Sequence, residues 1–355
     1  MAFSQKIKEN WAYTSMSALV LGGGMMGLAI AHDLIKNNVA VTLADINENC
    51  LNGMPYVKEH VNFAPLDAND NDAVKKIMKK SDVAISALPY DFNYNLAKTA
   101  IECKTHFCDL GGNVDVVEKE LSLHEKAKKA EILIIPDCGL APGITNVITS
   151  YLIKKVEGIK EIHIRVGGLP QEPEPPLNYA LFFSIHGLIN EYVEKARIVK
   201  EGHIKEVDSL TGVEEIKFPS FPDLEAFYTS GGTSTLPHSF KGMIEELDYK
   251  TIRYRGHCEK IKLLKDLGFF DGDSRKATEE ILEKNLEKNV PDVVLARVTG
   301  IGKEKRKVEF IDYFDERENI SAMMRTTGFS TAIIAQMIID GIIIQKGAVP
   351  PEKCI

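Results

Sequence analysis

The sequence predicts an α/β protein in which a doubly wound parallel sheet is followed by a second, α+β domain with a mixed or antiparallel sheet. Through about residue 140, short apolar runs alternate with helical stretches, which is typical of parallel strands buried on both faces. The first apolar run leads directly into a glycine triad and then a helix. Beyond Gly143, alternating apolar and polar residues indicate strands with one solvated face.

The first domain is expected to contain six strands joined mostly by helices. The predicted strands are Ala18–Leu21, Val39–Ala44, Val61–Leu66, Val83–Ala87, His106–Leu110 and Ile132–Pro136. The predicted helices are Met25–Asn37, Asp70–Lys80, Asn93–Cys103 and Val116–Ala130. This order matches the Rossmann sheet, in which ligands bind beyond the carboxyl ends of the strands.

The rest of the sequence is expected to begin with a helix and continue as a sheet domain. We expect a helix at Ile144–Lys155, strands at Ile162–Val166, Tyr249–His257, Leu295–Thr299 and Val308–Tyr313, and a hairpin at Ile198–Asp208 that turns at Gly202. Two loops are expected, proline-rich at Pro170–Pro176 and rich in Gly, Ser and Thr at Glu225–Pro237. A long helix is expected from Ser321 towards Asp340.

The glycine triad predicts a dinucleotide site. Gly22 permits the tight turn, Gly24 lets the backbone approach a pyrophosphate, and Gly27 lets the helix pack closely on the strand. The N–H groups of Met25, Met26 and Gly27 then face the phosphates at the helix N-terminus. A glycine-rich turn without a ligand is the simpler alternative, and the complete strand–triad–helix context argues against it.

The acids that follow the second and third strands bear on the choice of dinucleotide. Asp45 ends the second strand, where a carboxylate hydrogen-bonds the ribose 2′-hydroxyl of NAD. No Lys or Arg follows it closely to receive a 2′-phosphate, which favours NAD over NADP. Asp67 after the third strand is expected to reach the adenine. For both acids, a simple role in a turn is the alternative.

Loops at the ends of the later strands are expected to line the nicotinamide side. Asp109, before Gly111, is the acid best placed for proton transfer, although an acid before two glycines also commonly caps a turn. The other cofactor contacts predicted in these loops are Ala87, Leu88, Pro89, Leu110, Gly111 and Gly139. Cys138 has no identifiable His or Asn partner and is expected to be a packed residue rather than a nucleophile.

The histidines and cysteines indicate catalytic or metal-binding roles less clearly than the motifs above do. His257 follows a glycine-bearing segment and is a candidate catalytic residue, although a lone histidine is more often structural. No H-x-x-x-H or clustered Cys/His pattern predicts a metal site.

Composition limits the class of protein. The protein has 355 residues, of which 26% are charged, and a formal net charge of −8, which argues against nucleic acid as a partner. The 6 cysteines form no disulfide-like pattern, and no signal peptide or membrane span is evident, so we expect a cytoplasmic protein. The Lys-rich stretch Glu118–Lys129 also carries acids and is interpreted as a solvated helix face.

Several motifs together resemble the saccharopine dehydrogenase-like family. They are Gly22–Gly27, Asp109–Gly112, Pro136–Gly143, Val166–Pro170, Thr229–Thr235, Thr251–His257 and Gly347–Glu352. Within that family, Glu172–Leu177 and Leu224–Thr235 most resemble the L-lysine 6-dehydrogenases. The resemblance extends over nearly the whole sequence from about Ser17.

The resemblance implies a domain division and an activity. It implies an N-terminal extension at residues 1–16, an NAD-binding domain at 17–143 that is joined by a C-terminal helix and tail at 320–355, and a substrate-binding and oligomerisation domain at 144–319. It also implies NAD-dependent oxidative deamination of the lysine side chain with release of ammonia, by a homodimer or homotetramer. Substrate contacts are expected from Tyr90, Tyr179, Thr229, Ser230, Gly231, Thr233 and Arg253.

One departure from the family pattern concerns the leaving amine. Saccharopine-forming members carry an arginine in the loop that matches Gly231–Thr233, where this sequence has none. The loss of a bidentate carboxylate clamp suits a smaller substrate and leaves Arg253 as the expected carboxylate partner. Two alternatives stay open. One is a reductase that joins an amine to a carbonyl compound, as saccharopine- or carboxynorspermidine-type enzymes do, and the other is a non-catalytic dinucleotide sensor.

Overall fold

The computed structural model describes residues 16–288 and 290–355, and the protein divides into two compact units. The first unit comprises the described residues up to Gly143 together with Thr327–Ile355, and the second is Ile144–Thr326. The extension predicted at residues 1–16 lies outside the described residues, except for Met16. Each unit is built around its own sheet.

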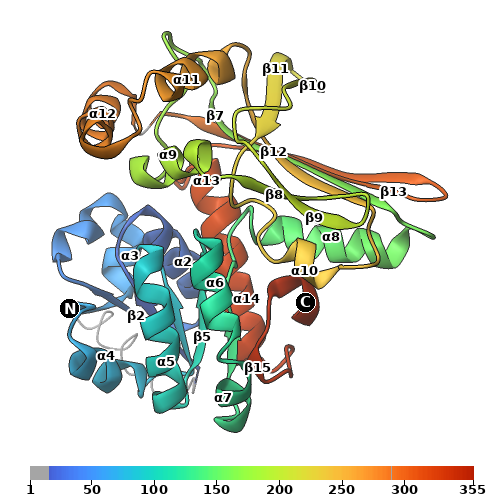
Figure 1. Cartoon of the computed structure of the whole chain (residues 1–355). Helices are drawn as coiled ribbons and strands as arrows, with labels where there is room; N and C mark the ends of the chain where they lie inside the picture. The colour runs from blue at the N-terminus through green and yellow to red at the C-terminus, as the bar shows by residue number, and fades with distance from the viewer. Residues whose placement is uncertain (1–15, 289) are drawn as a thin grey trace. The chain divides into compact units, whose positions relative to one another are not determined.

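The sheet of the first unit is parallel throughout, with the order β15-β6-β5-β4-β1-β2-β3 (Figure 1). The order of the strands reverses direction between β1 and β4, as in a doubly wound sheet, so the predicted fold class is confirmed. The strands are β1 (Ser17–Leu21), β2 (Ala40–Asp45), β3 (Asn62–Pro65), β4 (Val83–Ser86), β5 (His106–Asp109), β6 (Leu133–Ile135) and β15 (Gly347–Ala348).

Helices cover both faces of this sheet, with α2 and α14 packed together on one face and α4, α5 and α6 on the other (Figure 1). The helical segments are α2 (Met25–Lys36), η2 (Glu48–Gly53), α3 (Pro55–His60), α4 (Asn71–Met78), η3 (Tyr90–Phe92), α5 (Asn93–Cys103), α6 (Val114–Leu121), α7 (His124–Lys129), α14 (Ser330–Ile339) and α15 (Pro351–Cys354). Capping residues define several helix starts: the Asp70 carboxylate accepts the N–H groups of Asp72 and Ala73 at α4.

Two helices differ from their predicted course. The helix expected at Val116–Ala130 is divided into α6 and α7, because the Ser122 hydroxyl and the Leu123 N–H turn back to carbonyls of the preceding turn. The long helix expected from Ser321 is divided into α13 (Ala322–Met324), a π-helical segment at Arg325–Phe329, and α14.

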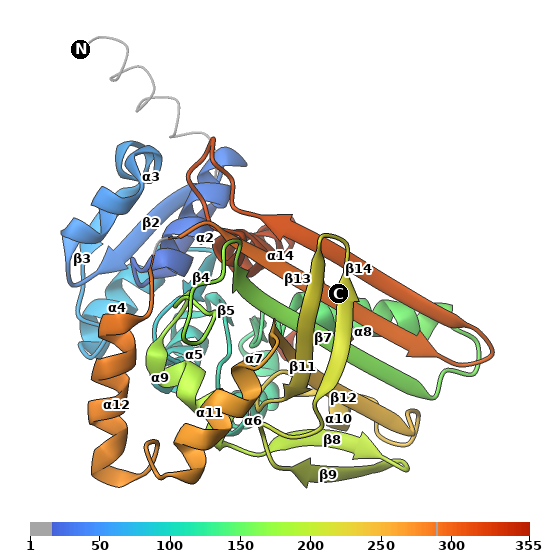
Figure 2. The same cartoon turned by 90° about the horizontal axis from the view of Figure 1, so that it is seen from above.

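The second unit contains a mixed sheet with the order β10-β11-β12-β7-β13-β14, in which only the β12–β7 pair among the described strands is parallel (Figure 2). The β8–β9 hairpin joins it through β12. The strands are β7 (Glu161–Pro170), β8 (Ala196–Lys200), β9 (His203–Val207), β10 (Glu214–Phe218), β11 (Phe221–Tyr228), β12 (Glu246–Tyr254), β13 (Asp292–Ile301) and β14 (Lys305–Tyr313). The mixed sheet that the sequence predicts is therefore confirmed.

Helices of the second unit are α8 (Ile144–Lys155), α9 (Ile185–Val193), α10 (Leu236–Ser239), α11 (His257–Asp266), α12 (Gly272–Asn285) and α13. Helix α8 packs on β13 and β14 (Figure 2). The predicted loop at Glu225–Pro237 is partly wrong, because its first residues complete β11. The Glu225 carboxylate there accepts the backbone N–H groups of Gly256 and Cys258 and fixes the start of α11. His257, which was expected to end the strand Tyr249–His257, is instead the first residue of α11.

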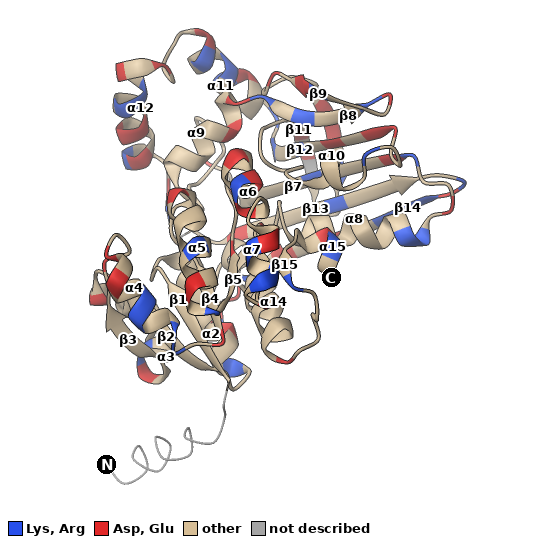
Figure 3. Ribbon diagram, turned by 60° about the horizontal axis from the view of Figure 1, so that its bottom comes forward, with Lys and Arg blue, Asp and Glu red and all other residues tan. Residues whose placement is uncertain are grey.

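Charge is mixed over both units. Blue and red segments alternate along α7 and α12 (Figure 3). Within the described part of the sequence, no helix is both long and apolar enough to cross a bilayer.

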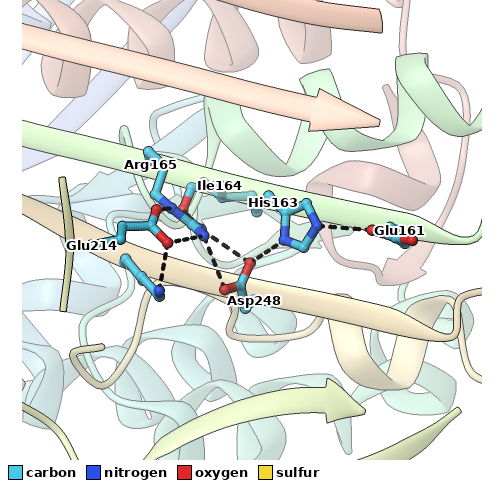
Figure 4. Close-up of polar contacts among 7 residues, drawn as sticks. Glu161, His163, Ile164, Arg165, Glu214 and Asp248 are labelled. Atoms are coloured by element: carbon cyan, nitrogen blue, oxygen red, sulfur yellow. Dashed lines mark hydrogen bonds and ion pairs between the residues drawn. The ribbon is translucent and has the colours of Figure 1, made fainter. Parts of the chain in front are cut away.

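A network of ion pairs joins three strands on one face of the mixed sheet (Figure 4). The Asp248 carboxylate on β12 accepts hydrogen bonds from both terminal nitrogens of Arg165, at 3.0 and 3.1 Å, and from Nδ1 of His163 at 2.7 Å. Glu214 on β10 accepts from Arg165 Nε and from Lys250. Arg165 is only 9% exposed at its side chain, so its charge depends on these partners.

We expect Asp248→Asn to destabilise the protein by about 3 kcal/mol, since it leaves a buried guanidinium with half its ionic partners. The hydrogen bond to Asp248 raises the pKa of His163. Burial alone would raise the pKa of Asp248, but the hydrogen bonds and charges of His163 and Arg165 outweigh burial and lower this pKa to about 2. The His163 contribution is therefore complete below about pH 6.5 and is lost as pH rises through the higher folded pKa.

Urea unfolding at several pH values measures both effects. Glu161→Gln is the matched control, because it removes the second partner of His163 and leaves Arg165 paired. A loss below about 0.5 kcal/mol for Asp248→Asn would contradict the assigned role.

Candidate functional site

The glycine loop of the first unit has the geometry that its spacing predicts. Gly22 lies at φ +100°, where a side chain would be strained, and its N–H donates to the Ala44 carbonyl. A Cβ at Gly27 would stand 1.8 Å from the Gly22 carbonyl oxygen, whereas one at Gly24 would meet no described atom within 4 Å. Packing therefore requires glycine at positions 22 and 27, and the middle glycine faces open space.

Helix α2 presents its N-terminus beside that open space. Gly24 is its N-cap and has no side chain to cover the first-turn N–H groups, which belong to Met25, Met26 and Gly27. No acid lies in the first turn, so the partial positive charge of the helix end is not neutralised there. These features fit a pyrophosphate, for which the loop and helix end would supply backbone donors.

Asp45 is fixed against the glycine loop. One carboxylate oxygen accepts the Gly23 N–H at 2.6 Å, and the other accepts the Asn47 N–H at 2.9 Å. The acid thus shapes a turn and also stands at the end of β2, where a ribose hydroxyl would approach. Asp67 is exposed, and its carboxylate accepts both the backbone and side-chain N–H groups of Asn69, which is the turn role.

The strand-end residues predicted as cofactor contacts lie in two groups. Ala87 and Leu88 pack beside Gly22, whose Cβ would stand 2.9 Å from the Ala87 carbonyl oxygen. Pro89 leads into η3, where the Tyr90 ring covers Gly112. Beyond β5, Leu110 and Gly111 follow Asp109, and Gly139 packs against Thr327.

Three buried carboxyl groups meet at the carboxyl ends of β5 and β6. Asp109 is fully buried, and its Oδ1 accepts the Gly111 N–H at 2.7 Å. Glu120 on α6 is also fully buried, and it lies close enough to Asp109 for the Asp109 charge to raise its pKa, while neither Glu120 oxygen has a hydrogen-bond partner in the described residues. Asp137 lies so close to Gly111 that a Cβ there would stand 1.9 Å from its Oδ1. This cluster accounts for the glycine at position 111.

Burial and the repulsion between carboxylates change the pKa values in this cluster. Burial raises the pKa of Asp109, and burial together with the nearby Asp109 charge raises the pKa of Glu120 still further. The two groups titrate as a pair, which keeps one proton at neutral pH, with the higher pKa on Glu120. A carboxylate paired with a carboxylic acid can both accept and return a proton. Burial raises the pKa of the Cys138 thiol well above its usual range, which agrees with a packed cysteine.

In the second unit, Arg253 on β12 lies among aromatic side chains. Its side chain is 3% exposed, and the guanidinium carbon stands 4.6 Å from the centre of the Tyr179 ring. Nε donates to the Tyr192 hydroxyl at 3.3 Å, and Nη1 donates to the Ile252 carbonyl. Among the described residues, Nη2 makes no hydrogen bond, and its anionic neighbour is Glu191 at 4.0 Å. The arginine predicted to hold a carboxylate thus has one nitrogen available.

His257 has both ring nitrogens occupied. Nδ1 lies 3.0 Å from the Leu177 carbonyl oxygen and must donate to it, so Nε2 accepts from the Tyr192 hydroxyl at 3.0 Å. Burial, and secondarily the charge of Arg253, lowers the pKa of His257 to about 3. The catalytic role predicted for His257 conflicts with this geometry, because a neutral ring with two partners has no nitrogen left for a substrate proton.

The predicted substrate loop at Thr229–Thr235 is held by its own hydroxyl groups. Thr229 bonds Thr251 at 2.7 Å, Ser230 donates to Glu194 and to the Asn190 carbonyl, and Thr233 donates to the Arg197 carbonyl. Gly231 lies at φ +86° with open space around it. These hydroxyls fix the loop, and the Gly231 backbone is its accessible point.

Two acids of these clusters were missed from the sequence. Glu120 lies in the charged stretch interpreted as a solvated face, and that interpretation is wrong at this position because its side chain is fully buried. Glu191 follows an asparagine on α9 and carries no motif. In the described residues, no group of three or more His, Cys, Asp or Glu side chains could hold a metal ion.

Comparison with known proteins covers both units. A family model described as the saccharopine dehydrogenase NADP binding domain matches residues 18–135, and one described as the saccharopine dehydrogenase C-terminal domain matches residues 139–355. The saccharopine dehydrogenase [NADP(+), L-glutamate-forming] of Pyricularia oryzae is 26% identical over 316 residues, which are 82% of this chain and 69% of that protein. The protein of the same name from Schizosaccharomyces pombe is 28% identical over 280 residues, 72% of this chain and 58% of its own length.

A solved structure extends the likeness to the fold. The apo histidine-tagged saccharopine dehydrogenase (L-Glu forming) from Saccharomyces cerevisiae superposes with a TM-score of 0.78 and 21% identity, over 95% of this chain and 94% of that chain.

Proposed function

The protein belongs to the saccharopine dehydrogenase family, and on this premise we propose that it is a nicotinamide-dinucleotide-dependent oxidoreductase that oxidises a carbon–nitrogen bond in the side chain of lysine or of a lysine-derived amino acid. The observation that carries the proposal is the buried Asp109–Glu120 pair at the carboxyl end of a dinucleotide-binding sheet. Buried carboxyl groups with raised pKa values at the strand ends of such a sheet favour an active site over a binding site without chemistry.

The residues have separate tasks in this reaction. The loop from Gly22 to Gly27 and the start of α2 would hold the dinucleotide, whose nicotinamide supplies a hydride acceptor when bound. Oxidation converts the substrate C–N bond to C=N, and water then adds to that carbon. Asp109 accepts the proton of the attacking water, while Glu120 keeps its own proton beside it and limits the build-up of charge. The C–N bond breaks as the amine leaves, and an aldehyde remains.

The leaving amine separates two versions of this function. Ammonia is the leaving amine if the substrate is L-lysine, and the loop without an arginine at Gly231–Thr233 supports this version. Glutamate is the leaving amine if the substrate is saccharopine, and the names of the relatives support that version. Both versions oxidise the same carbon and give the same aldehyde.

Absorbance at the reduced-nicotinamide wavelength tests the proposal. Purified protein is supplied with NAD or NADP and with L-lysine or saccharopine, and ammonia and glutamate are quantified. Reduction with either substrate supports the oxidoreductase, and the amine found decides between its two versions. No reduction with either substrate, despite measurable dinucleotide binding, would favour the dinucleotide sensor instead.

For the dinucleotide we propose NAD, in contrast to the NADP of the relatives' names. The Asp45 carboxylate would repel a 2′-phosphate, and residues 46–50 contain no Lys or Arg to offset it. We expect Asp45→Ser to weaken NAD binding about tenfold and to leave NADP binding unchanged or stronger, as measured by fluorescence titration. Asp67→Ser serves as control. An equal loss for both dinucleotides would place Asp45 away from the ribose.

A further inference from the structure

Glu191 and Arg253 form an ion pair that is incomplete. The Arg253 guanidinium is 3% exposed and permanently charged, and the 4.0 Å between its Nη2 and Glu191 Oε2 is too long for a hydrogen bond. The Glu191 side chain remains 32% exposed, so it is accessible to a ligand. A pair that served only to neutralise Arg253 would close to hydrogen-bond distance. The two charges are instead held apart.

A third group in the cluster also lacks a partner. Tyr179 is 4% exposed, and its hydroxyl oxygen has no hydrogen-bond partner in the part of the protein that the structure describes. Burial raises the pKa of this phenol far above its usual range, so it stays a hydrogen-bond donor. A buried hydroxyl without a partner is unfavourable unless a ligand provides one. The Tyr179 ring lies against the same guanidinium.

We infer that Glu191 is a specificity-determining residue, whose carboxylate accepts from the α-ammonium group of the substrate while the substrate carboxylate meets Arg253 Nη2, the partner expected from the sequence. This inference rests on the proposed function and adds to it the group that recognises the α-amine. In the head group of an α-amino acid, the amine nitrogen lies about 2.5 Å from the carboxyl carbon. Two opposite charges at that spacing fit beside protein charges 4.0 Å apart, each facing its opposite.

Electrostatics explains why both substrate charges are needed. A ligand with a carboxylate alone meets the repulsion of Glu191, and a ligand with an amine alone meets that of Arg253. Surrounding protein raises the pKa of Glu191 to about 7, and a bound ammonium group favours its ionised form. The ionised Glu191–Arg253 pair therefore has no net charge, and neither does the zwitterion that it binds.

Three ligands that share an alkyl chain and differ in the charges of the head group test this inference. L-Norleucine carries the complete head, hexanoate lacks its ammonium group, and pentylamine lacks its carboxylate. Isothermal titration calorimetry measures their binding to the full-length protein, with and without NAD. We expect L-norleucine to bind at least about tenfold more tightly than either of the other two.

The variant Glu191→Gln isolates the ammonium contact. We expect it to bind L-norleucine about 10- to 100-fold more weakly and hexanoate at least as well as before. Glu201→Gln is the matched control, since it removes the same charge from the same unit at the exposed turn between β8 and β9, where Glu201 pairs with Lys205. It should change the affinity for L-norleucine by less than about twofold. Circular dichroism and thermal unfolding of each variant establish that it is folded.

The outcomes separate this inference from the proposed function. If L-norleucine fails to bind, binds no better than hexanoate, or binds Glu191→Gln as well as the parent protein, the head-binding role is wrong. If the three ligands follow the expected order but neither L-lysine nor saccharopine reduces a nicotinamide dinucleotide, head binding stands and the proposed oxidation is wrong.

Discussion

Replacement of Asp109 by asparagine is expected to lower turnover about 10²- to 10⁴-fold, while dinucleotide affinity changes little. The amide retains an oxygen that can accept the Gly111 N–H, so the turn after β5 survives. It cannot accept a proton, and burial, the largest cause of the raised pKa of Glu120, still favours the protonated form of Glu120 after the Asp109 charge is lost. Neither group of the pair can then assist the addition of water.

Steady-state kinetics together with dinucleotide titration measures this effect. Glu120→Gln is the informative companion, since it keeps a neutral side chain in the same place and should lose much less activity. A fully active Asp109→Asn would show that Asp109 only fixes the turn and takes no part in the chemistry. Thermal unfolding controls for the loss of a buried carboxyl group.

Gly27→Ala is expected to destabilise the first unit by about 3 kcal/mol or more, with loss of dinucleotide binding. The new methyl group would stand 1.8 Å from the Gly22 carbonyl oxygen, which is backbone and cannot rotate away. Gly24→Ala should behave in the opposite way, because no described atom lies within 4 Å of its added Cβ. It should leave stability within about 0.5 kcal/mol and reduce dinucleotide affinity, since the methyl group occupies the path of the pyrophosphate.

Chemical denaturation measures the stability of the two variants, and fluorescence titration measures their dinucleotide affinity. Equal stability losses would mean that position 24 is enclosed. Unchanged dinucleotide affinity in Gly24→Ala would place the phosphates elsewhere than at the start of α2.

The parallel sheet was predictable because each of its long strands is a continuous apolar run between helical stretches. Leu19, Leu43 and Phe107 within these runs are completely buried, as the central residues of doubly covered strands are. The two-residue strand β15 was not predictable, since Gly347 and Ala348 carry no pattern. Helices α9, α11 and α12 were missed for another reason: tertiary packing around Tyr192 and Ile261 defines them more than periodicity does.

The candidate site was predictable only where a motif fixes the backbone. The glycine triad and Asp45 are local signals, and Asp109 marks a strand end. Glu120 and Glu191 acquire meaning from neighbours far away in sequence, at Asp109 and Arg253 respectively. The partners of His257, Leu177 and Tyr192, were not predictable because they belong to segments that the sequence does not connect to it.

The pairing of β15 with β6 has a consequence for biosynthesis. Gly347 and Val349 donate to the Ile132 and Ile134 carbonyls, and His124 bonds the Ala348 carbonyl, so the edge of the first sheet is completed by residues that follow the whole second unit in sequence. The ribosome makes the second unit before those residues emerge. During synthesis the β6 edge of the first sheet therefore stays unpaired, and β15 can pair with it only after the second unit has been translated.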